Sequence, residues 1–355
     1  MPFLQGDLVA TSRRLISIFL AFGAIACAAD PTLLNLVMPD AKVAFGVNVE
    51  KIVASPIGQQ IGSQIRQAPP ELQQIFKDTG FDPTRDLKEV LIASTGQGQN
   101  APTLILARGT FDIAKLSAFA FTSGRPPVMY EGVPILTHPA KGSGAMALLD
   151  STTVIGGDLE QVRAAIRRRE SSTPLNEAFA AKAAKLSAQY DVWGFSTVSL
   201  AGMAPAAPNA SLQQAADLLK SIQQVSGGMR FSPDMEMAAE LVTRSQKDAE
   251  SIRDTLGFVS AFLAANQKNA SGLKADALKV SVNARTVHIA LHITEAELKK
   301  AYEMQMARNA AMPGAMPGFS QSLAQQKARP ADTGLIIQSS EKDMGTVTLP
   351  PAKNN

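Results

Sequence analysis

Apolar and polar positions follow the same pattern at two places in the chain, Gly144–Arg169 and Ala275–Met304. In each place two short strand-like runs flank a tight turn, and an amphipathic run follows. Alternating apolar residues are typical of strands, whereas apolar residues three and four apart mark one face of a helix. Each stretch therefore predicts strand, turn, strand and helix.

The two predicted helices begin alike. Asp158 and Thr294 stand at the N-cap position, and Gln161 and Glu297 follow three residues later as the second half of a capping box. The same spacing then places three apolar residues on each helix face, namely Val162, Ala165 and Ile166 in the first stretch and Leu298, Ala301 and Tyr302 in the second. This repetition favours a duplicated architecture.

The rest of the chain extends the repetition. Each half is predicted to run strand, helix, strand pair, helix, strand pair, helix, with first strands at 41–49 and 190–200. Consecutive hairpins imply antiparallel sheets. We expect an α+β fold of two similar halves, each a mainly antiparallel sheet with helices packed on one face.

The length of 355 residues exceeds what one core usually supports, about 250–300 residues. We therefore expect several segments with different roles. They are a signal peptide at 1–28, a first α+β module at 29–170, a linker with a short helix at 171–189, a second α+β module at 190–308, and a mostly disordered tail at 309–355.

The N-terminus predicts export. Arg13 and Arg14 precede the apolar run Leu15–Ala26, and Ala26-Cys27-Ala28 is a plausible cleavage site. The run is shorter than the roughly 20 residues of a membrane-spanning helix, although an uncleaved anchor is the alternative. We expect an exported bacterial protein, located in the periplasm or associated with the outer membrane.

Cys27 is the only cysteine in the chain, and it has two interpretations. Ala24-Ile25-Ala26-Cys27 resembles a bacterial lipobox, which makes Cys27 a possible lipidation site and membrane tether. Alternatively, Cys27 is removed with the signal peptide. In both cases the folded part lacks cysteine and has no disulfide.

The amino-acid composition argues against one class of partner, nucleic acid. Apolar residues make up 45% of the chain and charged residues 18%, with a net charge of +3, as in a globular protein. Lysines and arginines are spread along the chain, and there are one Trp and three Tyr. A nucleic-acid interface needs a clustered basic face, so we predict no nucleic-acid partner.

His288 and His292 are the most tempting metal ligands, but they lie in an alternating run that predicts a strand. On a strand the two side chains share a face about 13 Å apart, because each residue rises ~3.3 Å. That separation is too large for one metal, so we predict a polar outer sheet face and no metal site. His138 is predicted to lie in a loop.

Two glycine-rich strings suggest cofactor binding only at first sight. Gly96–Ala101 resembles a dinucleotide fingerprint, but a strand follows it where a helix is required. Gly156-Gly157-Asp158 precedes a helix, where the Asp158 carboxylate favours capping over anion binding. We predict no cofactor.

The remaining charged and sulfur-containing clusters have ordinary interpretations. The basic helix end of Arg163 and 167–169 is predicted to be solvated, with partner binding as the alternative. Asp82, Asp86 and Glu89 lie where a loop meets a strand, with no histidine or arginine evident against them. The methionines of the tail could bind Cu(I), but their irregular spacing favours a disordered segment; they are Met304, Met306, Met312 and Met316.

The Tyr130–Leu136 hairpin, YEGVPIL, and Ala147–Ile166, ALLDSTTVIGGDLEQVRAAI, together with the export signal, resemble uncharacterised exported bacterial envelope proteins with a domain of unknown function. The resemblance covers mainly residues 41–169. It implies an envelope location and carries over no functional residue.

The sequence contains no metalloprotease, phosphate-loop or nucleophile-elbow motif, and we predict no catalytic residue. The leading hypothesis is a non-catalytic scaffold or interaction protein. One alternative is a binding protein for an apolar or peptide ligand held between the sheets or halves. The other is an enzyme whose groups converge only in three dimensions.

Overall fold

The structure, a computed structural model, describes residues 29–55, 58, 70–96, 101–122, 124, 126–137, 144–171, 175–199, 201, 217–231, 233–265 and 277–311. The chain divides into two compact units, 1–302 and 303–355. All the strands described belong to the first unit.

The strands are β1 (Val43–Asn48), β2 (Leu87–Ser94), β3 (Thr103–Gly109), β4 (Val128–Tyr130), β5 (Val133–Thr137), β6 (Ala145–Asp150), β7 (Thr153–Gly157), β8 (Val192–Ser196), β9 (Ile222–Arg230), β10 (Met235–Thr243), β11 (Leu278–Asn283) and β12 (Thr286–Ile293). The helices are α2 (Pro31–Leu34), α3 (Val49–Ala54), α5 (Pro70–Thr79), α6 (Pro83–Asp86), α7 (Ile113–Thr122), α8 (Leu159–Glu170), α9 (Glu177–Gln189), α11 (Gln246–Ala265) and α12 (Glu295–Ala311).

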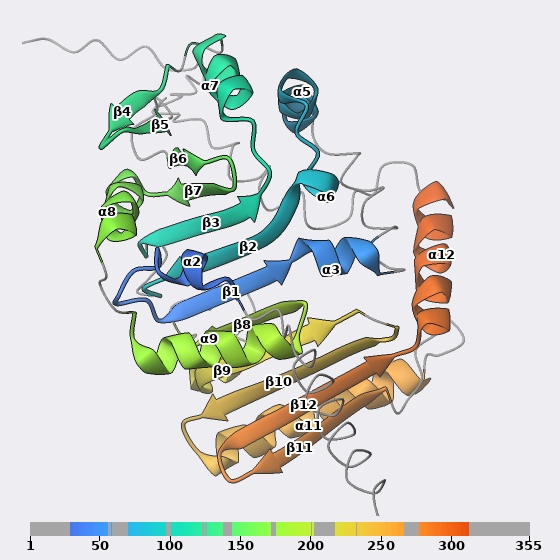
Figure 1. Cartoon of the computed structure of the whole chain (residues 1–355). Helices are drawn as coiled ribbons and strands as arrows, with labels where there is room; N and C mark the ends of the chain where they lie inside the picture. The colour runs from blue at the N-terminus through green and yellow to red at the C-terminus, as the bar shows by residue number, and fades with distance from the viewer. Residues whose placement is uncertain are drawn as a thin grey trace, which may run out of the picture. The chain divides into compact units, whose positions relative to one another are not determined.

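These strands form one twelve-stranded sheet in the order β11-β12-β10-β9-β8-β1-β2-β3-β7-β6-β5-β4 (Figure 1). Neighbouring strands are antiparallel, which confirms the α+β class with an antiparallel sheet. We expected one sheet in each half. Instead β1 pairs with β8, so strands of both predicted modules share one sheet.

Gly46 explains how β1 and β8 meet. It pairs directly with Trp193, and a Cβ atom at position 46 would lie 2.3 Å from the indole ring. Only glycine therefore leaves room for the ring over β1. Trp193 and Phe195 are buried in the largest core cluster, which also contains residues of α2, α8 and α9. We call their face of the sheet the front and the opposite face the back.

Helices cover both faces of the sheet, not one face as the sequence suggested. Cross-strand pairing runs from Phe45 through Gly194, Gly227 and Ala239 to Ile289, all of which lie on the back because Gly194 alternates with Trp193 and Phe195. Ile289 packs in the cluster that contains buried residues of α11. In Figure 1, α9 lies in front of β8 and β9, whereas α11 lies behind β10 and β12.

The first half also carries apolar residues on both faces. Leu104 and Leu106 of β3 face the front core, whereas Ala107 packs at the back with Ile113 and Leu116 of α7. A strand buried on both faces reads as a continuous apolar run rather than an alternating one. The continuous apolar runs LILA in β3 and AMALL in β6 were therefore a signal for helices on both faces.

Both predicted hairpin-plus-helix units exist, as β6-β7-α8 and β11-β12-α12. The capping box at Thr294 is confirmed, because Glu297 accepts from Thr294 N at 2.9 Å and Glu297 N lies 3.4 Å from Thr294 Oγ1. Asp158 is the N-cap of α8 but makes no side-chain capping bond. Its carboxylate accepts from Thr103 N on the neighbouring β3.

The predicted signal peptide, including Cys27, lies outside the described residues, as do His138 and most of the predicted tail. Among the helices described, none is long and apolar enough to cross a membrane.

Candidate functional site

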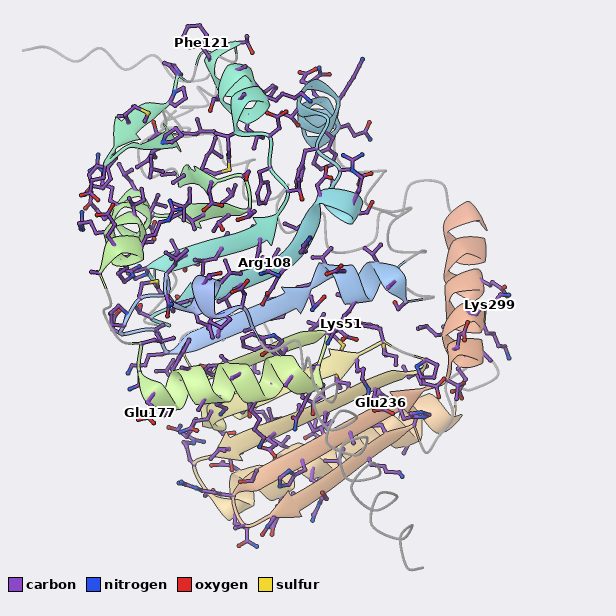
Figure 2. The ribbon with its side chains drawn as sticks, viewed as in Figure 1. Lys51, Arg108, Phe121, Glu177, Glu236 and Lys299 are labelled. Atoms are coloured by element: carbon purple, nitrogen blue, oxygen red, sulfur yellow. The ribbon has the colours of Figure 1, made fainter. Side chains whose placement is uncertain are left out.

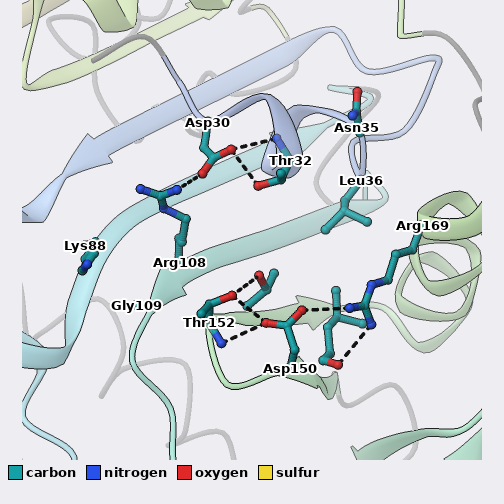
Figure 3. Close-up of a pocket in the computed structure, with 12 residues that line it drawn as sticks. Asp30, Thr32, Asn35, Leu36, Lys88, Arg108, Gly109, Asp150, Thr152 and Arg169 are labelled. Carbon is teal, nitrogen blue, oxygen red and sulfur yellow. Dashed lines mark hydrogen bonds and ion pairs between the residues drawn. The ribbon is translucent and has the colours of Figure 1, made fainter. Parts of the chain in front are cut away.

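The candidate site, which we call the main cleft, lies on the front of the first half and has a volume of about 580 Å³ (Figure 3). It lies where the segment before β1 and the β6–β7 hairpin approach the ends of β2 and β3. Its lining residues are Asp30, Thr32, Asn35, Leu36, Lys88, Arg108, Gly109, Leu149, Asp150, Thr152, Thr153 and Arg169. Arg108 of β3 marks the site in the full side-chain view (Figure 2).

One wall is built around Asp30, the N-cap of the short helix α2. Asp30 Oδ1 accepts from Thr32 N at 2.8 Å and from Thr32 Oγ1 at 2.6 Å. Its other oxygen, Oδ2, accepts from Arg108 Nη1. The Asp-Pro-Thr sequence thus fixes the carboxylate, and the carboxylate in turn fixes the guanidinium.

The opposite wall repeats the arrangement with Asp150. In the turn of the β6–β7 hairpin, Asp150 Oδ1 accepts from Thr152 N at 2.8 Å and from Thr152 Oγ1 at 2.7 Å. Asp150 Oδ2 accepts from Arg169 Nη2 at 2.9 Å, and Arg169 Nη1 donates to the Leu149 carbonyl at 3.1 Å. Two Asp-x-Thr turns therefore each hold one arginine in the cleft.

These contacts favour the ionised form of both aspartates. Partial burial acts to raise the pKa of Asp30, but the Thr32 hydrogen bonds and the Arg108 charge outweigh it and lower the pKa. Burial opposes ionisation at Asp150 too, and Thr152 and Arg169 again lower the pKa. A general base needs a pKa near the working pH, so neither aspartate suits that role.

Glu89 differs from the two aspartates. It lies beside Arg108 in the β2–β3 ladder. Burial raises the pKa of Glu89 despite a hydrogen bond from the Asp30 backbone and the charge of Arg108. The expectation that no arginine stands against the acidic group was therefore wrong, since Arg108 lies beside Glu89 and Arg85 pairs with Asp86.

The basic end of α8 is largely bound rather than solvated. Arg168 donates to the Leu36 carbonyl at 2.9 Å, and burial lowers its pKa. Arg169 belongs to the cleft, and Arg167 donates to the Tyr130 hydroxyl. Arg163 pairs with Glu160 in the same helix, and its guanidinium lies over the Tyr130 ring at 5.4 Å from the ring centroid. The prediction of a solvated helix end was wrong for Arg168 and Arg169, because Arg168 reaches the N-terminal segment at Leu36 and Arg169 reaches the end of β6 at Leu149 and Asp150.

His288 and His292 lie on strand β12, as predicted. Their side chains are 44% and 54% exposed, with His288 Nδ1 at 3.7 Å from Glu240 and His292 Nε2 at 3.1 Å from Asp234. Among the described residues, no group of three or more His, Cys, Asp or Glu side chains could hold a metal ion.

The other glycine and methionine strings form no site in the described structure. Gly96 and Ala101 flank a segment outside the described residues, and β3 follows directly. Gly156 and Gly157 end β7, where Gly157 pairs with Leu104 and with Ala145. Met304 and Met306 lie in α12, whereas Met312 and Met316 lie outside the described residues.

Two further clefts lie on the front of the second half, beside Glu236 of β10 (Figure 2) and beside Glu240 of the same strand. Their volumes are about 490 and 380 Å³, and both are lined by Tyr190 and Ala238. His292 lines the larger one.

Sequence reasoning missed the main cleft because its residues are distant along the chain. Asp30 and Arg108 meet only when α2 lies over β3, and Asp150 meets Arg169 only when α8 folds back over its own hairpin. The Asp-x-Thr turns at Asp30 and Asp150 were a readable local signal. The arginines that pair with these aspartates could not be identified from the sequence.

Comparisons with known proteins give a limited result. No protein-family model matches the chain, and no curated protein matches it. Among solved structures, crystal form III of TP0453 aligns with a TM-score of 0.48 and 12% identity over 78% of this chain and 98% of that one. Crystal form I aligns with a TM-score of 0.46 and 10% identity over 78% and 98%. Similarity at this level identifies neither a family nor a function.

Proposed function

We propose that the protein is an exported, non-catalytic interaction protein of the bacterial envelope, free or tethered through Cys27. The observation that carries the non-catalytic part is the pairing in the main cleft. Asp30 and Asp150 are each held by a threonine and an arginine, which lower the pKa of both carboxyls. The export part rests on the pattern from Arg13 to Ala28.

Mass spectrometry of the mature N-terminus from fractionated cells tests the export part. A diacylglyceryl-modified Cys27 in a membrane fraction, or an unmodified chain starting at Ala29 in the periplasm, supports export. A full-length chain in the cytosol contradicts it.

Photo-crosslinking in living cells tests the interaction part. The photoreactive residue p-benzoylphenylalanine replaces Ile105 or Phe121, which are 44% and 68% exposed, and a matched variant carries it at exposed Glu177. A defined adduct at an apolar position that is missing at Glu177 supports the proposal. Uncrosslinked protein at both apolar positions contradicts it.

We also propose that the two halves arose by duplication. From the centre outward, the strand order is β1-β2-β3-β7-β6 on one side and β8-β9-β10-β12-β11 on the other. The connection β3–β6 contains α7, and β10–β11 contains α11. The β4–β5 hairpin is then an insertion in the first half. This agreement supports the two similar halves expected from the sequence.

Binding of an apolar or peptide ligand is the second candidate, favoured by one feature of the back face. Phe45, Ile92 and Ile105 pair in one row across β1, β2 and β3, and Phe45 and Ile105 are 42% and 44% exposed. Nile red, a neutral apolar dye, tests this candidate. Saturable fluorescence that falls in the Phe45→Ser variant supports it, and unchanged fluorescence in that variant contradicts it.

A further inference from the structure

We propose that the main cleft is a binding site for a small organic anion that carries a carboxylate or a phosphate group. Arg108, Arg169 and Lys88 supply the recognition. This inference goes beyond the proposed function and does not rest on it.

The cleft has the size of a small-molecule site. Its volume of about 580 Å³ lies within the range of about 300–1,000 Å³ found for ligand pockets. Polar groups line it together with the apolar side chains of Leu36 and Leu149. It can therefore take an organic body as well as a charged group.

Both arginines are oriented and still have donors to offer. A guanidinium carries five N–H donors. In the described contacts, Arg108 donates through Nη1 to Asp30, and Arg169 donates through Nη1 and Nη2 to Leu149 and Asp150. Their side chains are 44% and 46% exposed. A guanidinium held on one side presents its other N–H groups in the planar geometry that suits carboxylate and phosphate.

The aspartates do not cancel this preference. Each carboxylate already accepts two hydrogen bonds from a threonine and one from an arginine. Each Asp–Arg pair is close to neutral. Lys88 adds an exposed cation to the lining, and no described contact pairs its ammonium with a carboxylate. The lining therefore has three cations against two carboxylates.

Glu89 lies beside Arg108 on the neighbouring strand β2 and is not part of the lining. Its negative charge is disfavoured by burial, which raises its pKa. Its carboxylate therefore opposes the positive charge of Arg108 less readily than an exposed glutamate would.

Two irregularities in the sheet aim residues at this cleft. The β2–β3 register shifts between Leu87 and Glu89, which leaves Lys88 as the extra residue. The β6–β7 register shifts between Leu148 and Asp150, which leaves Leu149 as the extra residue. Both extra residues line the cleft. Bulges re-aim side chains and are enriched beside functional sites. This is a second observation that points to the same place.

Isothermal titration calorimetry on the purified protein tests the proposal. The probes are glycerol 3-phosphate for the phosphate arm, citrate for the carboxylate arm and glycerol as the neutral control. Low ionic strength is used because salt screens exposed charges. We expect saturable binding of at least one anion and none of glycerol, and the stronger arm tells whether phosphate or carboxylate is the preferred group.

Three variants locate the binding. Arg169→Gln removes a charge-assisted donor and is expected to weaken binding on the order of ten-fold or more. Lys88→Gln is expected to weaken it several-fold. Arg163→Gln removes a cation from the same helix outside the cleft and should leave affinity unchanged. Circular dichroism checks that the variants fold. Because Lys88 is exposed, Lys88→Gln still tests the proposal if Arg169→Gln does not fold. Absence of saturable binding by both anions, or equal affinity in the wild type and Lys88→Gln, overturns the proposal.

Discussion

The two hairpin-plus-helix units of this protein start from similar sequences and end differently. In the first unit, Val162, Ala165 and Ile166 of α8 are buried in the front core. In the second, Leu298 and Ala301 of α12 are only half-buried, although the spacing from the cap is the same. The difference therefore lies in the hairpins and not in the helix pattern.

The hairpins present different surfaces to the front. Ala145, Ala147 and Ile155 of β6 and β7 belong to the front core. The corresponding face of β11 and β12 carries Lys279, His288 and His292, because Val287 and Ile289 point to the back. A helix gains little by covering polar side chains that are already solvated.

The strands also enter their helices in opposite phase. Gly157, the residue before Asp158, faces the front together with Leu104. Ile293, the residue before Thr294, faces the back with Val287 and Ile289. A slip of one residue exchanges the two faces of a strand. An alignment that matches the caps of the two units therefore mismatches their sheet faces. The repeated sequence pattern predicts the same local elements in both units, but not the same buried face.

Shortening one apolar side chain in each helix is expected to show the largest difference between the two units. Ile166→Ala removes a buried side chain of α8 and should lower the free energy of unfolding by about 2–5 kcal/mol. Leu298→Ala in half-buried surroundings should cost less than ~1 kcal/mol. Urea unfolding measures both. Equal losses would contradict the difference between the units.

The sequence was sufficient for the local elements and not for their assembly. Short apolar runs located β6, β7 and β11, alternation located β12, and cap residues located α8 and α12. The joining of the halves was out of reach because the β1–β8 pairing depends on Gly46 admitting the Trp193 ring. The cleft was missed for a similar reason, since Asp30 and Arg108 become neighbours only through tertiary packing.

Overpacking where β1 pairs with β8 is expected to give the second-largest loss of stability. Gly46→Ala places a methyl group against Trp193 and should cost about 1–3 kcal/mol through overpacking. Gly156→Ala is the control, because its Cβ would meet only the Ala145 carbonyl, at 3.6 Å. If thermal unfolding shows no difference between the two variants, Trp193 is not the element that joins the halves.

Removing the N-cap side chain should have a smaller effect on each helix, and the effect should differ in kind between α8 and α12. Thr294→Ala removes a capping box worth about 1 kcal/mol, so amides of α12 should exchange roughly five-fold faster while global stability stays the same. Asp158→Ala should lower global stability by about 0.5 kcal/mol through the helix dipole. Hydrogen exchange combined with urea unfolding measures both. A global loss in Thr294→Ala would show that α12 is part of the core.

Removing the partly buried carboxyl of Glu89 is expected to give the smallest effect. Burial raises the pKa of Glu89 above its usual value of 4.5, so the native state holds this proton more tightly than the unfolded state. The contribution of Glu89 to wild-type stability therefore falls as pH rises through the window that begins near 4.5. The Glu89→Gln side chain still accepts a hydrogen bond from the Asp30 amide. Because it does not titrate, it does not contribute this loss of stability as pH rises. Its advantage over the wild type should grow from pH 4 to pH 7.5 in urea unfolding, and a pH-independent difference would contradict the assignment.

Native-state hydrogen exchange at two matched pairs of amides tests the central comparison most directly. Val162 N donates to the Asp158 carbonyl at 2.9 Å, and Leu298 N donates to the Thr294 carbonyl at 3.0 Å, so the first helical bond is the same in both units. Because only α8 is packed, Val162 and Ala165 should exchange through global unfolding. Leu298 and Ala301 should exchange at least about a hundred-fold faster through local opening. Equal protection at the two pairs would contradict the account.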